Sequence, residues 1–555
     1  MTERLFLVLR IRLIDRKGLA MNRKLYYNGQ ILTMDDRYHS PEAVLAENGR
    51  IMALGRTEEL KTIGRDAELV DLEGAVMLPG FIDGHSHLTA TAYQLLMVNV
   101  NPSPTGSCNS VKELVEEGRR ALAQTHLEEG QWFMGMGYDN SVYPDGKHPT
   151  REDLDKISRD IPVSMMHVSG HLCVVNTKAM ELLGYGGSGY EVPEGGVVQP
   201  DGLLKEQAFL APHKQKLMQG PGPDQVLKAV GRASRLYASY GITTAQDGRT
   251  TRSDYELLKA AGAAGLLKND VVSYMAVDCA KEFLPRQYPA LNGYRNHYRL
   301  AGCKIYLDGS PQGKTAWLSQ PYLVPPDGQN EEYKGFPVME SEDVFQVMET
   351  CIRNHWQINV HANGDEAIEQ MIRCYTKALK AVEHPEKLRP VVIHCQTVRE
   401  DQLDRMKGIG MLPSFFLDHV YYWGDYHYES ALGPERAERI SPAASAVKRS
   451  MSFTLHQDSP VVPPNILFSI HNAVNRKTKN GMVLGEEQRV PVSEALKAAT
   501  IYAAYQIFEE ENKGSITPGK LADFVILDQN PMKVSKEALK DIKVLRTMKE
   551  GEDIL

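Results

Sequence analysis

Long hydrophobic runs are missing from this 555-residue sequence. A membrane-spanning helix needs about 18 or more consecutive apolar residues, and no such uncharged stretch occurs. An excess of positive charge is missing too, since 63 Lys and Arg stand against 71 Asp and Glu, for a net charge of −8. A nucleic-acid-binding protein is expected to carry a basic stripe. We therefore expect neither a membrane nor a nucleic acid as a partner.

Cysteine is scarce and shows no pattern. The seven cysteines are odd in number, scattered along the chain, and form no C-x-x-C pair. A disulfide framework calls for an even set at regular spacing, so the sequence indicates a reduced, cytoplasmic chain with free buried thiols. In other respects the composition, 42% hydrophobic and 24% charged, is that of an ordinary globular protein.

The first twenty residues lack the features of a signal peptide. Their apolar segment is interrupted by Arg10, Arg12, Asp15 and Arg16, whereas a signal-peptide core runs uninterrupted over roughly 7–15 residues. Met21 begins a more regular segment. We interpret residues 1–20 as a disordered arm or the product of an upstream start site.

Both ends of the remaining chain are rich in short strands. Turn signals at Asn28-Gly29 and Asn48-Gly49 separate apolar runs, as in β-hairpins. A similar pattern returns in "GSITPGKLADFVILDQNP" near the C-terminus. We predict one small β-sandwich domain that is built from residues 21–78 and 514–555.

Between these ends, strand-like runs that finish in polar residues alternate with helical patterns. Apolar residues recur at helical spacing after "NVHANGD", and "PVVIHCQTVREDQLDRMKGIG" repeats the plan. Such repetition is typical of the α/β class, and here it predicts a (β/α)8 TIM-type barrel over residues 79–513. We interpret residues from about 100 to 240 as a large inserted lobe with its own helices, including 110–124 and 224–241.

Two histidines stand one residue apart in "FIDGHSHL", which begins at Phe81. In an extended chain residues i and i+2 point the same way, so His85 and His87 can face one metal ion together. By itself an H-x-H pair is weak, because surface and loop histidines are common.

Further polar groups end other predicted barrel strands, namely Lys304, His361, His394 and Asp458. Taken singly, either histidine is more often an ordinary core or loop residue, and Asp458 could cap a helix. Lys304 is harder to explain, because an amine inside a barrel strand is unfavourable unless it is paired or modified. Carboxylation would turn it into an anionic carbamate that can bridge two ions.

Four histidines and one aspartate at the ends of different parallel strands can hold two divalent metals, and this ligand type favours zinc. Two metals roughly 3.5–4 Å apart lower the pKa of a bridging hydroxide toward about 7 and so create a nucleophile for a carbonyl carbon. Asp458 would take the proton and pass it to the leaving nitrogen. Metal-binding histidines must be neutral, so we expect activity to fall below about pH 6.

The motifs "LPGFIDGHSHL", "VHANGDEAIE", "VVIHCQ" and "GKLADFVILDQNP" resemble the amidohydrolase superfamily. Within it the chain is similar to the amidohydrolase-3 group, which includes YtcJ-like proteins and N-substituted formamide deformylases. The resemblance extends from about residue 24 to 545. It implies a metal-dependent hydrolase of a small molecule, acting on carbon–nitrogen but not peptide bonds, with Lys304 carboxylated.

The resemblance also implies roles for single residues. His85 and His87 would bind one metal, His361 and His394 the other, with Lys304 as the bridge and Asp458 as the catalytic base. His171 and Glu206 lie on motifs of the inserted lobe and are candidate substrate-binding residues, although hydrogen bonds within the lobe explain them equally well. Two positions depart from the group's usual pattern: His456, where a small residue is common, and His167, where an arginine is common.

The substrate and the reaction are less well defined than the site. An N-substituted amide or formamide is the leading substrate class. A lyase, isomerase or deaminase on the same scaffold and a catalytically idle binding protein are the alternatives. Trp132, Tyr138, Tyr143 and Leu172 suggest a pocket for an aromatic or apolar group. The oligomeric state is open, a homo-oligomer included.

Overall fold

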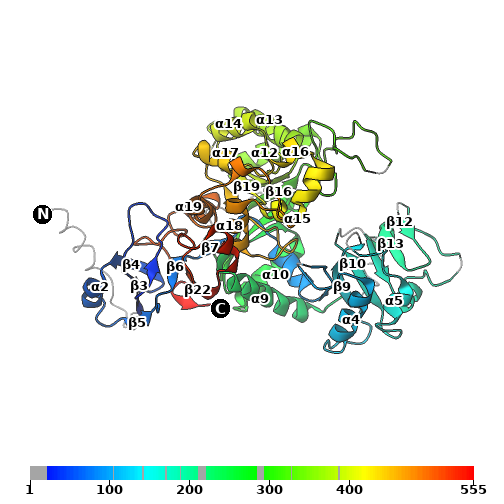
Figure 1. The fold of residues 1–555 in the computed structure, drawn as a ribbon, viewed down its shortest axis with the longest axis horizontal. Coiled ribbons are helices and arrows are strands. Elements are labelled where there is room, and N and C mark those ends of the chain that lie inside the picture. Colours follow the sequence, from blue (N-terminus) through cyan, green and yellow to red (C-terminus); the bar gives the residue numbers. More distant parts are fainter. Residues whose placement is uncertain are drawn as a thin grey trace.

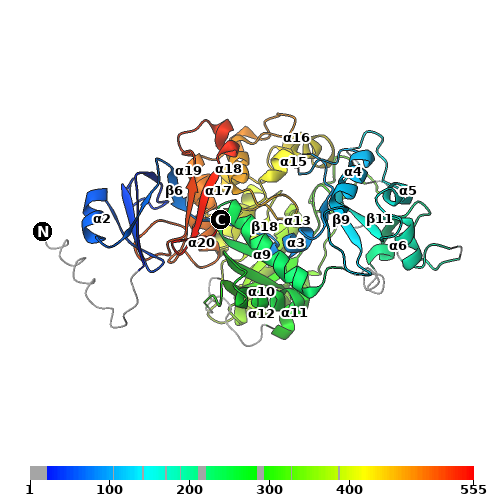
Figure 2. The same ribbon diagram turned by 90° about the horizontal axis from the view of Figure 1, so that it is seen from below.

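A computed structural model describes residues 22–103, 105–140, 143–168, 172–187, 189–194, 196–210, 220–283, 293–326, 328–385 and 388–555. Three regions follow one another along the longest axis of the molecule: a β-rich end region, a central barrel and a lobe (Figure 1). The same order is kept when the molecule is turned by 90° (Figure 2). Residues 1–20, our candidate arm, lie outside the described residues.

Eight parallel strands form the central sheet, in the order β20-β19-β18-β17-β16-β15-β14-β7. The sheet curls until its first and last strands meet, where the Gly84 N–H donates to the Leu455 carbonyl at 3.2 Å. The predicted (β/α)8 barrel is confirmed. Its strands are β7 Phe81–Ile82, β14 Ile242–Thr250, β15 Asp270–Ala276, β16 Tyr298–Tyr306, β17 Gln357–Ala362, β18 Val391–His394, β19 Leu412–Phe415 and β20 Thr454–Leu455.

Helices cover the outside of the barrel because each presents an apolar stripe to the strands. In α13 (Asp365–Ala381) the buried stripe includes Ile368, Met371, Ile372 and Tyr375, which are residues that the helical pattern predicted. The other barrel helices include α3 Leu88–Gln94, α9 Pro223–Ser239, α10 Arg252–Ala263, α11 Val277–Phe283, α12 Ser341–Arg353, α14 Glu400–Ile409, α15 Asp418–Tyr426 and α18 Ile466–Asn475. None of the described helices is long and apolar enough to cross a membrane.

Two sheets make up the β-rich end region. One has the order β4-β3-β1-β5 and the other β2-β6-β21-β22-β23. The second sheet joins the two chain ends, because β6 pairs antiparallel with β21, and residues of both sheets share one apolar core. The strands are β1 Arg23–Tyr27, β2 Gln30–Ile31, β3 Ala43–Glu47, β4 Arg50–Gly55, β5 Glu68–Asp71, β6 Val76–Pro79, β21 Phe524–Leu527, β22 Val544–Lys549 and β23 Glu552–Asp553.

The lobe is built on a six-stranded sheet with the order β12-β13-β11-β10-β9-β8, whereas the sequence pattern had indicated only helices there. Its strands are β8 Val98–Asn99, β9 Phe133–Tyr138, β10 Val163–His167, β11 Leu172–Val175, β12 Gly196–Val198 and β13 Leu203–Glu206. Its helices are α4 Val111–Leu122, α5 Arg151–Asp155, α6 Thr177–Leu182 and α7 Gln207–Leu210.

One helix that we expected in the lobe belongs to the barrel. Helix α9 packs on α3, β14 and β22, and its Ala229, Val230 and Tyr237 lie in the barrel core. An amphipathic pattern shows that a helix buries one face but does not show which neighbour covers it, and this explains the error.

Candidate metal centre

All six predicted centre residues lie at the carboxyl ends of barrel strands. Lys304 and His361 stand in β16 and β17, His394 ends β18, and His85, His87 and Asp458 follow β7 and β20. Parallel strands bring their carboxyl ends to one mouth of a barrel, so residues far apart in the chain meet there. Backbone hydrogen bonds hold the outermost loops together: Asp458 N–H donates to the His85 carbonyl at 3.3 Å and His87 N–H to the Ser459 carbonyl at 2.8 Å.

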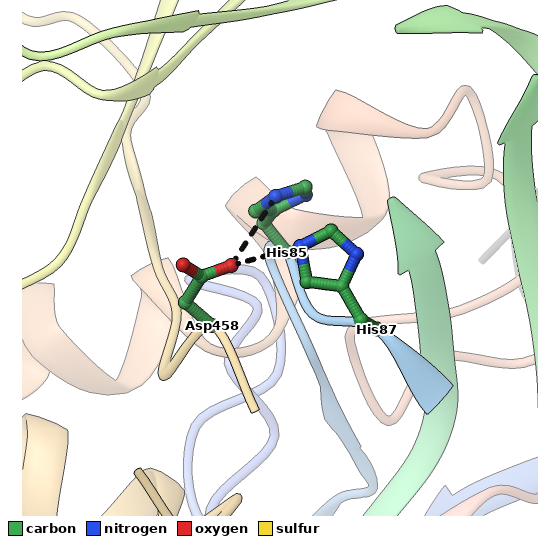
Figure 3. Close-up of side chains that lie close together, drawn as sticks. All are labelled: His85, His87 and Asp458. Atoms are coloured by element: carbon green, nitrogen blue, oxygen red, sulfur yellow. Dashed lines mark ion pairs between the residues drawn. The ribbon is translucent and has the colours of Figure 1, made fainter. Parts of the chain in front are cut away.

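His85, His87 and Asp458 converge on one point (Figure 3). Asp458 Oδ1 lies 3.2 Å from His87 Nε2 and 3.5 Å from His85 Nε2, and one ligand atom from each residue falls within 4.8 Å of the others. Two atoms bound to one zinc ion at about 2.0–2.1 Å in tetrahedral geometry lie roughly 3.3 Å apart. The spacing of this triad therefore suits one ion.

The same carboxylate reaches toward a second pair of histidines. His361 Nδ1 and His394 Nε2 are 3.1 Å apart, and Asp458 Oδ2 lies 4.0 Å from His394 Nε2. Asp458 thus stands between the two histidine pairs, with one oxygen toward each. Its Oδ1 atom is buried yet forms no hydrogen bond within the described part of the chain. An unsatisfied buried carboxylate oxygen is costly, and a cation would satisfy it.

Lys304 completes the cluster from inside the barrel. Its Nζ lies 2.9 Å from His85 Nε2, and no ion pair joins it to a carboxylate among the residues that the structure describes. Burial lowers the pKa of Lys304 to about 7, although the charge of Asp458 acts in the opposite sense. A large fraction of this amine is therefore uncharged, and so nucleophilic, at neutral pH.

The protonation states also suit a cation. Burial lowers the pKa of His85 and His394 well below the usual value and that of His361 to about 4. Burial acts in the opposite direction on Asp458, but His394 and His87 outweigh it and hold the pKa of this carboxyl well below its usual value. Neutral imidazoles and an ionised carboxylate are the forms that bind metal.

Backbone strain is concentrated here. His394 has φ 72°, Cys395 φ 51° and Asp458 φ 52°, all in the left-handed region that non-glycine residues seldom adopt. Such conformations cost of order 1–3 kcal/mol each and are typical of functional sites.

Two residues of the centre were missed as site residues by the sequence analysis. A Cβ at Gly248 would lie 2.0 Å from His85 Cε1, so only glycine lets the His85 ring occupy its place. The Gly309 carbonyl accepts a hydrogen bond from His361 Nε2 at 3.0 Å. Gly248 lies within the motif "GITTAQDG" and Gly309 within "KIYLDGSPQG", but no sequence pattern shows that either touches a histidine.

The two candidate residues of the lobe stay predictions. His171 lies outside the described residues, and Glu206 ends β13 with a side chain that is likewise not described. His167 is a half-buried lobe residue, with Nε2 3.8 Å from Asp139 Oδ1. Three of the lobe residues named for an apolar pocket, Trp132, Tyr138 and Tyr143, are buried in its apolar cores.

Known proteins were compared with this fold and site. A sequence model of the amidohydrolase family matches residues 68–554. This chain belongs to the amidohydrolase family. It is 26% identical over 567 residues to a Bacillus subtilis (strain 168) protein named as an amidohydrolase, YtcJ, covering 96% of this chain and 99% of the relative.

Two further relatives of this amidohydrolase agree with that assignment. The N-substituted formamide deformylase of Arthrobacter pascens is 25% identical over 558 residues, which cover 96% of this chain and 98% of the relative. An uncharacterized metal-dependent hydrolase from Pyrococcus furiosus superimposes with a TM-score of 0.73 at 25% identity, covering 92% of this chain and all of the other. Together these findings support a metal-dependent hydrolase and confirm the resemblance that the motifs indicated.

Proposed function

We infer that this amidohydrolase hydrolyses a non-peptide carbon–nitrogen bond of a small molecule, an N-substituted amide or formamide. One observation carries the proposal: Asp458 lies between two pairs of histidines, with a buried Oδ1 that accepts no hydrogen bond in the described part of the chain. The relative named as an N-substituted formamide deformylase, similar over nearly the whole chain, supports the substrate class.

The donor set fits two divalent ions, with zinc the first candidate because the ligands are imidazoles and a carboxylate. His85 and His87 would hold one ion, and His361 and His394 the other. Ions bound there would polarise the substrate carbonyl and make water nucleophilic near neutral pH.

Lys304 would supply the bridge between the two positions. Its uncharged Nζ forms a bond to the carbon of CO₂ and loses one proton, which yields a carbamate with one negative charge and two oxygen donors. The lowered pKa of Lys304 supports this chemistry, because only the unprotonated amine has the electron pair that the new bond needs. The carbamate would also remove the cost of burying an ammonium group.

Asp458 would move the proton during hydrolysis. It is ionised, and its buried Oδ1 atom accepts no hydrogen bond in the described part of the chain, so it can accept a proton from the attacking water. Donating the same proton to the leaving nitrogen lets an amine depart as the carbon–nitrogen bond breaks. The other product is a carboxylate, which is formate when the substrate is a formamide.

Metal content per chain is the decisive test, measured by inductively coupled plasma mass spectrometry on protein purified without chelator. We expect two equivalents of zinc or a similar ion, together with turnover of a member of a panel of N-substituted formamides and amides. No metal after reconstitution would contradict the proposal. A turned-over substrate whose products show no added water would instead favour a lyase or isomerase on this scaffold.

A further inference from the structure

His456 lies in the centre but is not among the predicted ligands. It follows β20 and is fully buried. Its ring centroid lies 5.1 Å from that of His394 and 5.6 Å from that of His85. A bulky polar side chain in this place needs hydrogen-bond partners, because an unsatisfied buried imidazole is costly.

Both nitrogens of His456 have a partner. Nε2 lies 3.1 Å from His394 Nδ1, and Nδ1 lies 2.8 Å from Ser414 Oγ. His394 in turn faces His361 through Nε2. Ser414, His456 and His394 therefore form a chain of hydrogen bonds that ends at the second pair of histidines.

His361 shows how a histidine of this pair is oriented. Its Nε2 contacts the Gly309 carbonyl at 3.0 Å. Asn363 Nδ2 lies 3.0 Å from the same Nε2. When Nε2 donates to the carbonyl, which only accepts, Nδ1 keeps its lone pair, and Nδ1 is the atom that faces His394. The Gly309 carbonyl thus offers His361 an acceptor that leaves Nδ1 free for an ion.

No carbonyl contacts Nδ1 of His394 among the residues that the structure describes. In the described part of the chain, the group that contacts its Nδ1 is the imidazole of His456, which can donate or accept. If Ser414 donates to His456 and His456 donates to His394, the hydrogen of His394 stays on Nε2 and blocks that atom as a ligand. If the chain runs the other way, His394 Nδ1 donates to His456, His456 donates to Ser414 Oγ, and Nε2 is bare.

We propose that His456 is a positioning residue that accepts the His394 Nδ1 hydrogen and so leaves the His394 Nε2 lone pair free for the ion shared with His361. The proposal rests on the metal-binding function inferred above. Metal-binding histidines are usually held by an acceptor on the other ring nitrogen, and loss of that acceptor costs about 10- to 100-fold in metal affinity. Ser414 is the last acceptor of the chain.

Zinc affinity tests the proposal through competition with a chromogenic chelator at pH 7.5, on the full-length chain. His456→Leu removes the acceptor, and we expect one of the two zinc equivalents to bind about 10- to 100-fold more weakly. In His456→Gln the amide oxygen can reach the place of Nε2, so most of the affinity should return. Ser414→Ala should cause a smaller loss. Melting of the metal-free proteins shows whether each variant folds.

A matched control is His427→Leu. His427 is an equally buried histidine, and its Nε2 contacts His419 Nδ1 at 3.1 Å. Among the described residues, His427 forms no hydrogen bond with a residue of the centre. We expect unchanged zinc affinity.

Four results would overturn the proposal, and they can be told apart. Equal affinity in His456→Leu and wild type would remove the role of His456 while leaving the proposed function intact. Loss of affinity in both His456→Leu and His456→Gln would make His456 a ligand instead. An equal loss in His427→Leu would show a general packing effect. Failure of the wild-type protein to bind zinc would overturn both the positioning role and the proposed function.

Discussion

Two clusters of buried charged residues lie at opposite ends of the barrel, and each contains lysine. At the carboxyl end, Lys304 Nζ contacts a histidine, and burial lowers its pKa to about 7. At the amino end, Lys513 Nζ lies 2.5 Å from Asp270 Oδ2. Burial again acts to lower its pKa, but Asp270, Tyr294 and Glu509 together outweigh burial and the pKa is raised.

The difference between the two lysines shows how burial alone changes the pKa of a lysine and how a neighbouring carboxylate reverses that change. Asp270 also contacts Lys549 at 3.0 Å, and Lys549 contacts Asp523 at 3.0 Å. This network joins the first residue of β15 to the β-rich end region, so its charges are compensated and structural. Lys304 has no such compensation, and an amine that is forced toward its neutral form is chemically reactive.

The largest expected effect is the loss of activity when Lys304 is replaced. Lys304→Met removes the bridging group, and metal ions in hydrolases supply several kcal/mol of transition-state stabilisation. Since about 1.36 kcal/mol is a factor of ten, we expect kcat/KM to fall by about 10³-fold or more. The free energy of unfolding of metal-free protein should not fall, because Met replaces a buried amine that forms no ion pair with a carboxylate among the described residues. If Lys304→Met lowered the free energy of unfolding as much as a Lys513 variant does, Lys304 would also have a structural role, and the difference between the two lysines would not hold.

The converse substitution, Lys513→Met, should act on stability. It leaves Asp270 with fewer compensating charges, and removal of one partner of a buried ion pair costs about 3–5 kcal/mol. We expect a loss near the lower value, because Lys549 remains. Urea unfolding of the metal-loaded protein measures the change. Activity per folded molecule at low temperature should stay near that of the wild type. A large fall in that activity would mean that the Asp270–Lys513 network at the amino end of the barrel affects catalysis.

Carboxylation of Lys304 gives a smaller, pH-dependent effect. Protein depleted of CO₂ at acid pH should regain activity when CO₂ is added. At constant dissolved CO₂, the recovery rate should rise about tenfold for each pH unit below 7 and level off above about 8, because a pKa of about 7 limits the uncharged fraction only below that range. A rate that keeps rising to pH 9 would indicate an ordinary lysine with a pKa near 10.4.

The pH below which the protein loses metal should be lower than the sequence alone indicated. The sequence alone indicated loss below about pH 6, from an unperturbed histidine. Burial lowers the pKa of His361 to about 4, so protons compete for this ligand only as the pH falls toward 4. Equilibrium dialysis followed by metal analysis should therefore show the equivalent bound by His361 and His394 retained at pH 5.5. Loss of that equivalent at pH 6 would mean that water reaches the pair more freely than the structure shows.

Much of the fold was predictable from local pattern. Apolar runs that end in polar residues and alternate with amphipathic helices predicted the barrel, and the helix face of Ile368, Met371 and Tyr375 was predicted correctly. The lobe sheet was not predicted, because short strands such as β8 and β12 carry too few residues to show a period of two. The assignment of α9 to the lobe was wrong for a related reason, since periodicity does not identify the covering partner.

The sequence by itself determined which residues could bind a metal, because strand ends in a parallel barrel meet at one mouth whatever their separation in the chain. Only the tertiary structure decided their chemical states. Burial lowers the pKa of Lys304 and so favours its uncharged amine. Asp458 lies between two histidine pairs. Ser414 on β19 contacts His456, which follows β20. Such properties depend on distance and solvent exclusion across the barrel, which no local pattern of residues contains.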